Sequence, residues 1–263
     1  MMRPSTLLLA ATAAALLAGC VSNGQKTVDG RPIDENSAAN ANMKLGIAYM
    51  QQNKLALAKE KLERAEKQDP KNYEVYWGLA SLAERLNNSA DAERYYQTAM
   101  RLAPGKPEVT NTYAVFLCRN GHVDRAMPLY DKVIADPLYP TPWAAATNAA
   151  VCLRSEKRHG DAMPYLQKAL SLRPDFIPAV VELADVQIST GKPAEARATA
   201  DRFLGIGRKS PDVLLVAARA AVAEGNCGAT EIYSRLLRRD YPSSTQTSSL
   251  AQVLASCGRT ATP

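Results

Sequence analysis

Small and apolar residues recur at a fixed interval along most of the chain. Six residues are each followed, 34 positions later, by another small, apolar or proline residue: Leu45, Tyr49, Ala58, Leu62, Ala65 and Pro70 are followed by Leu79, Ala83, Ala92, Tyr96, Ala99 and Pro104. A constant interval of this length predicts a repeat protein, in which each unit buries its apolar face by stacking on the next. Small residues at fixed points indicate two antiparallel helices per unit, packed closely where their axes approach.

The register continues towards the C-terminus. Matching positions are Ala126, Tyr130, Ala150, Ala162, Leu166, Ala169, Pro174, Leu183, Ala184, Gly191 and Ala196, with a weaker copy at Ala217, Ala218, Gly225 and Pro242. The interval from Ala126 to Ala162 is 36 residues, so two extra residues lie within 136–142. This connector divides the predicted array into two halves of three repeats. We expect prolines to end the second helices and glycines to lie in the turns.

These positions resemble the tetratricopeptide pattern of a Leu-Gly or Leu-Ala pair, a Tyr, then Ala, an aromatic residue or Leu, Ala and a closing Pro. The resemblance implies an all-α fold, a right-handed α-solenoid of about six helix pairs spanning residues 39–242. We expect repeats near 39–72, 73–106, 107–140, 143–176, 177–210 and 211–242. Residues 243–263 are expected to form a C-terminal tail or a capping helix.

The N-terminus has the features of a targeting segment. Arg3 precedes an apolar run, Leu7 to Leu17, which is shorter than the about 20 residues needed to cross a bilayer. The run ends in Leu17-Ala18-Gly19-Cys20, which resembles a bacterial lipobox. That resemblance implies a lipoprotein signal peptide at 1–19 and a lipid on Cys20. The alternative is an ordinary secretory signal with a chance cysteine.

Residues 20–38 are predicted to be a flexible, lipidated tether. The segment is polar, contains Gly24, Gly30 and Pro32, and has no apolar period. As a flexible coil it would span about 20 to 25 Å. Val21 favours the outer membrane, because Asp at that position resembles an inner-membrane retention signal. We therefore expect a protein on the periplasmic face of the outer membrane, held by its acyl chains.

A closer resemblance rests on several features together. The lipobox, the six repeats, the helix at 111–118 and the connector Asp136-Pro137-Leu138-Tyr139-Pro140 resemble the type IV pilus lipoproteins of the PilF and PilW family. The resemblance implies a pilotin, which binds the pilus secretin subunit, promotes its outer-membrane localisation and multimerisation, and supports pilus biogenesis and twitching motility. The alternative is a general periplasmic scaffold that recruits peptidoglycan enzymes or outer-membrane assembly factors.

The first helices of such repeats line a concave groove, and their register selects candidate partner-binding residues. These are Met43, Ile47, Met50, Trp77, Glu74 and Asn111. Methionine and tryptophan there suit an amphipathic segment of the secretin. Some of these side chains would instead pack on the tether or a neighbouring helix. Met43 and Ile47 replace the Lys and Asn of the carboxylate clamp in chaperone-binding relatives, so a C-terminal carboxylate ligand is not expected.

The cysteines other than Cys20 suit an oxidising compartment. Cys118 and Cys152 are expected near the ends of adjacent first helices, where a disulfide would clamp the two halves; the alternative is two separate buried thiols. Cys227 and Cys257 form a second possible pair, which would pin a capping helix over residues 250–254. The sequence leaves that pairing open.

Charge and motifs give no sign of catalysis. The chain has a net charge of +6, and its tightest basic cluster, Arg235, Arg238 and Arg239, favours a solvated helix face over a nucleic-acid site. His122 and His159 are expected in exposed turns. No metal-binding, phosphate-binding or nucleophile motif occurs in the sequence. We therefore expect no enzyme activity, no catalytic or metal site, no cofactor, no small-molecule substrate and no nucleic-acid partner.

Overall fold

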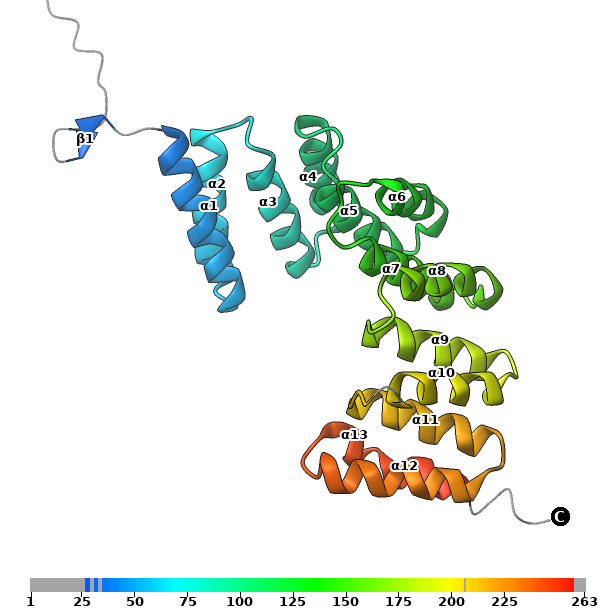
Figure 1. The fold of residues 1–263 in the computed structure, drawn as a ribbon. Helices are drawn as coiled ribbons and strands as arrows, with labels where there is room; N and C mark the ends of the chain where they lie inside the picture. The colour runs from blue at the N-terminus through cyan, green and yellow to red at the C-terminus, as the bar shows by residue number, and fades with distance from the viewer. Residues whose placement is uncertain (1–26, 29–30, 33–34, 206, 258–263) are drawn as a thin grey trace, which may run out of the picture.

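The computed structural model describes residues 27–28, 31–32, 35–205 and 207–257. The predicted signal peptide at 1–19, Cys20 and most of the predicted tether lie outside this part of the chain. Within it, fourteen helices follow one another in an extended, bent array (Figure 1). They are α1 (Glu35–Gln51), α2 (Leu55–Gln68), α3 (Tyr73–Arg85), α4 (Ser89–Leu102), α5 (Pro107–Arg119), α6 (Val123–Ala135), α7 (Pro142–Ser155), α8 (His159–Leu172), α9 (Ile177–Ser189), α10 (Pro193–Gly205), α11 (Pro211–Ala223), α12 (Cys227–Asp240), α13 (Thr245–Ser248) and α14 (Leu250–Cys257).

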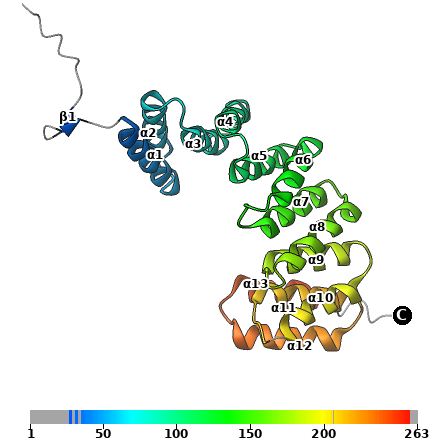
Figure 2. The ribbon, with the colours of Figure 1, turned by 45° about the horizontal axis from the view of Figure 1, so that its top comes forward.

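The all-α solenoid predicted from the sequence is confirmed. Helices α1 to α12 form six successive antiparallel pairs, and each pair packs on the next. Both views place α3, α5 and α7 on the inner side of the bend and α4, α6 and α8 outside it (Figures 1 and 2). Helices α13 and α14 pack against α11 and α12 at the C-terminal end. Residues 245–257 therefore form a helical cap.

The region expected to be a tether differs from the prediction in two respects. Two strands, β1 (Thr27–Val28) and β2 (Arg31–Pro32), pair in antiparallel fashion. The sequence between them is Asp29-Gly30, a dipeptide that favours tight hairpins. In addition, α1 begins at Glu35, before the expected boundary at residue 39. Residues 35–39 contain two alanines and neither glycine nor proline, so nothing in that stretch stops the helix.

Local sequence explains where the other helices begin and turn. Prolines stand in the first turn of α5, α7 and α11, where their missing N–H costs nothing. As expected, Gly121, Gly191 and Gly225 lie in turns, with φ of 76°, 75° and 73°. Three other turns place non-glycine residues in the same left-handed region, namely Asn53, Asn87 and Lys157. Asparagine tolerates that conformation, so the turn geometry is kept where glycine is absent.

Two glycines allow the first helices to approach the buried side chain of Leu62. A Cβ atom at Gly46 would lie 2.6 Å from Leu62 Cγ and 3.3 Å from the carbonyl oxygen of Ala58. A Cβ atom at Gly78 would lie 2.9 Å from Leu62 Cδ2, the mobile end of that side chain. Leu62 is fully buried. It therefore occupies space that a side chain at either glycine would need.

We expect Gly46→Ala to lower the free energy of unfolding by about 1 to 2 kcal/mol, because overpacking costs more than the gain in helix propensity. Gly78→Ala should be nearly neutral, since only the end of Leu62 has to move. Urea unfolding of the two variants measures this difference. Equal destabilisation by both substitutions would contradict the packing described for Leu62.

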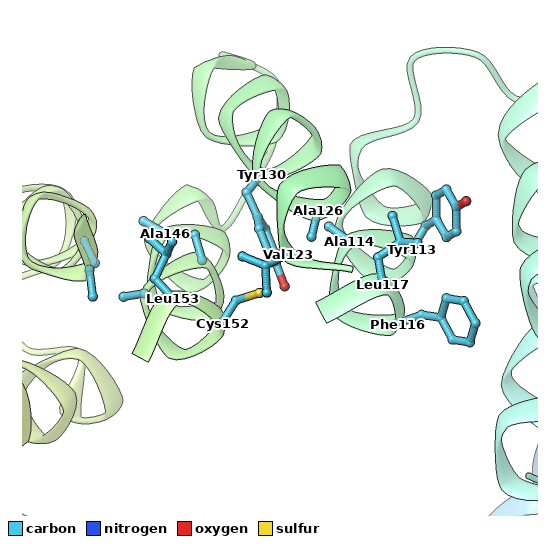
Figure 3. Packing of buried hydrophobic residues seen from close by; sticks show 14 of the residues in the cluster. Tyr113, Ala114, Phe116, Leu117, Val123, Ala126, Tyr130, Ala146, Cys152 and Leu153 are labelled. Atoms are coloured by element: carbon cyan, nitrogen blue, oxygen red, sulfur yellow. The ribbon is translucent and has the colours of Figure 1, made fainter. Parts of the chain in front are cut away.

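The junction between the third and fourth repeats is filled by one large side chain. Tyr130 of α6 is buried and stands between the α7 residues Ala146 and Leu153 and the α5 residues Ala114 and Leu117 (Figure 3). Burial raises the pKa of the Tyr130 hydroxyl well above its usual value. The tyrosine therefore acts here as a neutral core residue that joins the two halves.

Candidate partner-binding surface

The expected outward orientation of Met43 and Met50 is wrong. Their side chains are only 5% and 8% exposed and belong to the same core cluster as Leu62 and Leu79. The physical reason is helical geometry, because residues 43 and 50 are two turns apart and share one face of α1 with Gly46. That face packs on the neighbouring helices. Met43 and Met50 therefore stabilise the first repeat, and neither offers a side chain to a partner.

Ile47 and Trp77 are partly exposed. Ile47 packs against the first core cluster, and its Cγ1 lies 4.0 Å from the position that a Cβ at Gly78 would take. Trp77, one residue before this glycine, packs against the central core with part of its ring accessible. The two apolar side chains thus lie on adjacent helices, where each keeps some surface for contact.

Polar residues adjoin this apolar area on α3 and α5. Glu74 is half-buried and accepts a hydrogen bond from the Tyr73 hydroxyl at 3.2 Å. Asn111 is half-buried, and its Oδ1 is shielded from solvent with no hydrogen-bond partner among the described residues. Buried acceptors without a partner are uncommon in folded proteins. We call Ile47, Glu74, Trp77 and Asn111 the N-terminal inner face.

Charged groups that the sequence did not single out hold these helices together. The Tyr96 hydroxyl donates to Glu84 Oε1 at 2.5 Å, and Arg119 Nη1 lies 3.8 Å from Glu84 Oε2. The guanidinium of Arg85 donates to the backbone carbonyl of Met50. These contacts connect α3 with α4, α5 and α1. Burial, and then the bond to Glu84, raises the pKa of Tyr96, so this hydroxyl keeps its proton.

Aromatic rings fill the space between the second and third repeats. The ring centroid of Tyr96 lies 5.7 Å from that of Tyr113 and 5.3 Å from that of Phe116. Tyr113 and Phe116 extend from α5 on the side away from Tyr130 (Figure 3). Tyr96 occupies the position that corresponds to Leu62 in the repeat register and fills the space between two helix pairs, but the register does not indicate its two aromatic neighbours. The cluster fixes α5, which carries Asn111, relative to α3, which carries Trp77.

The expected Cys118–Cys152 disulfide is present in the structure, and so is the Cys227–Cys257 pair that the sequence left open. Cys118 of α5 bonds to Cys152 of α7, with 5.6 Å between their Cα atoms. Cys227 of α12 bonds to Cys257 of α14, with a Cα separation of 5.7 Å. The first bridge crosses the connector between the two halves, where Tyr139 packs into a small core with Val133 and Ala145. The second bridge ties the capping helix to the last repeat.

No helix in the described ranges is both long and apolar enough to cross a bilayer. Likewise, the described part of the chain contains no group of three or more His, Cys, Asp or Glu side chains suited to a metal ion. His122 is exposed and His159 is half-buried, each at the start of a second helix.

The repeat pattern, the stacked helix pairs and the inner face define a helical repeat protein suited to protein binding. Models of the tetratricopeptide repeat match residues 43–107, 117–175 and 153–220. The chain belongs to the tetratricopeptide-repeat family.

Comparison with individual proteins narrows the relationship. The chain is 26% identical over 232 residues to the type IV pilus assembly protein PilF of Pseudomonas aeruginosa. The alignment covers 87% of this chain and 90% of PilF. It is 29% identical to PilW, described as a widely conserved type IV pilus biogenesis factor, with a TM-score of 0.67 over 82% of this chain and 99% of PilW. The structure of Pseudomonas aeruginosa PilF gives a TM-score of 0.64 at 24% identity, covering 83% of this chain and 98% of PilF. The expected homology to the PilF and PilW proteins is thus confirmed.

Proposed function

We propose that this chain is a pilotin, a lipoprotein that binds the type IV pilus secretin subunit and promotes its localisation and multimerisation in the outer membrane. Homology to PilF and PilW supports a role in type IV pilus biogenesis through protein binding. The similarity to PilF over 232 residues carries the proposal, since it spans nearly the whole chain. The tetratricopeptide fold is a binding scaffold in other proteins as well, so fold alone would not select this role.

In this proposal the secretin segment contacts the N-terminal inner face. Ile47 and Trp77 supply apolar area, and burial of such area drives association. Asn111 contributes a half-buried amide side chain on α5. Glu74 adds a negative charge beside the apolar area. The earlier candidates Met43 and Met50 are left out, because both are buried in the core.

The lipid anchor is the second part of the proposal. Its support is the Leu17-Ala18-Gly19-Cys20 lipobox, which lies outside the described residues. Two or more acyl chains on Cys20 would hold the protein on the outer membrane, since one chain alone binds only marginally. The tethered solenoid would then meet secretin subunits beside the membrane in which they assemble.

A deletion strain tests both parts. Loss of the gene should abolish twitching and remove heat-stable secretin multimers from outer-membrane fractions, and the wild-type gene should restore both. Cys20→Ser should incorporate no labelled palmitate and should restore few multimers, because the protein is no longer anchored. Normal multimers in the deletion strain would refute the pilotin role. If the Cys20→Ser protein incorporated no palmitate and still restored the secretin multimers fully, only the need for the lipid anchor would be refuted.

A further inference from the structure

The basic cluster on α12, which has no part in the proposed pilus role, borders a hollow in the surface. The hollow is lined by Ile232, Arg235, Leu236, Arg238 and Arg239 and has a volume of about 580 Å³. Ile232 is 51% exposed, which is high for a large aliphatic side chain. The cluster is therefore more than a solvated helix face, because apolar surface lies open between the arginines.

A second hollow adjoins the first and shares two of its residues. It is lined by Leu204, Gly207, Arg208, Lys209, Leu214, Leu236, Arg239 and Asp240. We call the two hollows together the α12 trough. Among the residues that line it, five are basic and one, Asp240, is acidic. The trough thus combines leucine and isoleucine side chains with a marked excess of positive charge.

Several of these basic groups are poorly satisfied within the chain. Arg235 forms no ion pair among the described residues, and Arg238 Nη1 lies 3.9 Å from Glu231 Oε1 in a solvent-exposed pair. Arg239 is already paired with Asp240 through two hydrogen bonds, of 2.6 and 3.0 Å, and Lys209 Nζ lies 3.7 Å from the same carboxylate. Arg208 Nη1 is buried with no hydrogen-bond partner in the described chain. The exposed guanidinium groups of Arg235 and Arg238 therefore favour a carboxylate ligand, which each can bind through two parallel hydrogen bonds.

The shape of the surface selects among anionic partners. A bilayer presents a broad surface of headgroups and does not fill a hollow that is lined by both apolar and basic side chains. A peptide with acidic and apolar side chains on opposite sides can fill this hollow, because its apolar groups enter it while its carboxylates contact the arginines. The charge and the shape therefore favour the same kind of partner.

We propose that the α12 trough binds an acidic, amphipathic segment of a second protein. Helix α12, which carries most of the basic residues of the trough, lies at the end of the solenoid opposite α1 (Figure 2). A partner there would leave the N-terminal inner face free, so the protein would hold two partners at once. This role is independent of the pilotin proposal.

The test uses the purified full-length protein and a fluorescein-labelled synthetic helix with glutamates on one face and leucines on the other. Arg235→Glu combined with Arg238→Glu should weaken binding of this peptide at least about tenfold, measured by fluorescence anisotropy at about 0.15 M ionic strength. Ile232→Asp should also weaken binding. The matched control is Arg64→Glu with Lys67→Glu, which has the same spacing and charge change on exposed positions of α2. It should bind as wild type does.

Three results would overturn the proposal. Equal losses in the α12 and α2 variants would mean that overall charge, and not the trough, attracts the peptide. Equal binding of a scrambled peptide of the same composition would remove the need for an amphipathic ligand. Preferential binding of vesicles that contain phosphatidylglycerol, lost in the α12 variant while peptide binding stays, would assign the trough to lipid. Circular dichroism of each variant confirms that it is folded.

Discussion

Replacing Cys118 and Cys152 by alanine together should lower the free energy of unfolding by about 3 to 4 kcal/mol. The bridge closes a loop across a sequence separation of 34 residues, so its loss restores conformational freedom to the unfolded chain. It also removes the covalent link between α5 and α7 at the junction of the two halves. Guanidinium unfolding, followed by far-UV circular dichroism, measures the change.

Cys227→Ala with Cys257→Ala provides the comparison. Its sequence separation of 30 residues is nearly the same, so loop closure alone predicts a similar loss. The two double variants should differ in which helices lose protection from amide hydrogen exchange. The first variant should lose it around the central junction, and the second around α12 and α14. An unchanged unfolding midpoint after removal of Cys118 and Cys152 would contradict the clamping role.

Tyr96→Ala should destabilise the protein by about 3 to 5 kcal/mol, in the range measured for large aromatic residues in packed cores. Tyr96 is fully buried and packs against the rings of Tyr113 and Phe116. The substitution leaves a cavity between α4 and α5 and removes the donor to Glu84. Chemical denaturation gives the free energy directly.

Tyr96→Phe separates the two effects. It keeps the ring and loses only the hydrogen bond to Glu84, so we expect a cost of about 1 to 2 kcal/mol. If the alanine and phenylalanine variants were equally destabilised, the hydrogen bond would dominate, and the aromatic packing proposed for this junction would be wrong.

The fold could be predicted because the same physical constraint recurs in every repeat. Ala58, Ala92 and Ala126 are all fully buried, as are the spacers Leu62 and Tyr96. A small residue that recurs in repeat after repeat at a nearly constant interval gives a signal that a single helix cannot give. The turns were only partly predictable, because Asn53, Asn87 and Lys157 adopt a conformation that their sequence neighbours do not reveal.

The binding surface was predicted less well, for a physical reason. Alignment to a repeat register gives the angular position of a residue on its helix, but it does not say how neighbouring helices cover that position. Met43 and Met50 satisfy the register and are nonetheless covered, because Gly46 and Gly78 allow the helices to pack closely there. Contacts between repeats, such as Arg85 with the carbonyl of Met50, have no local sequence signal.

The central claim is that the N-terminal inner face contacts the pilus secretin. A photo-crosslinking amino acid with a benzophenone side chain at Trp77, which replaces one aromatic group by another, tests it directly in living cells. We expect a crosslinked product containing secretin from this position and none from the same amino acid at Lys132, an exposed residue of the outer helix α6. Secretin crosslinked from Lys132 but not from Trp77 would contradict it.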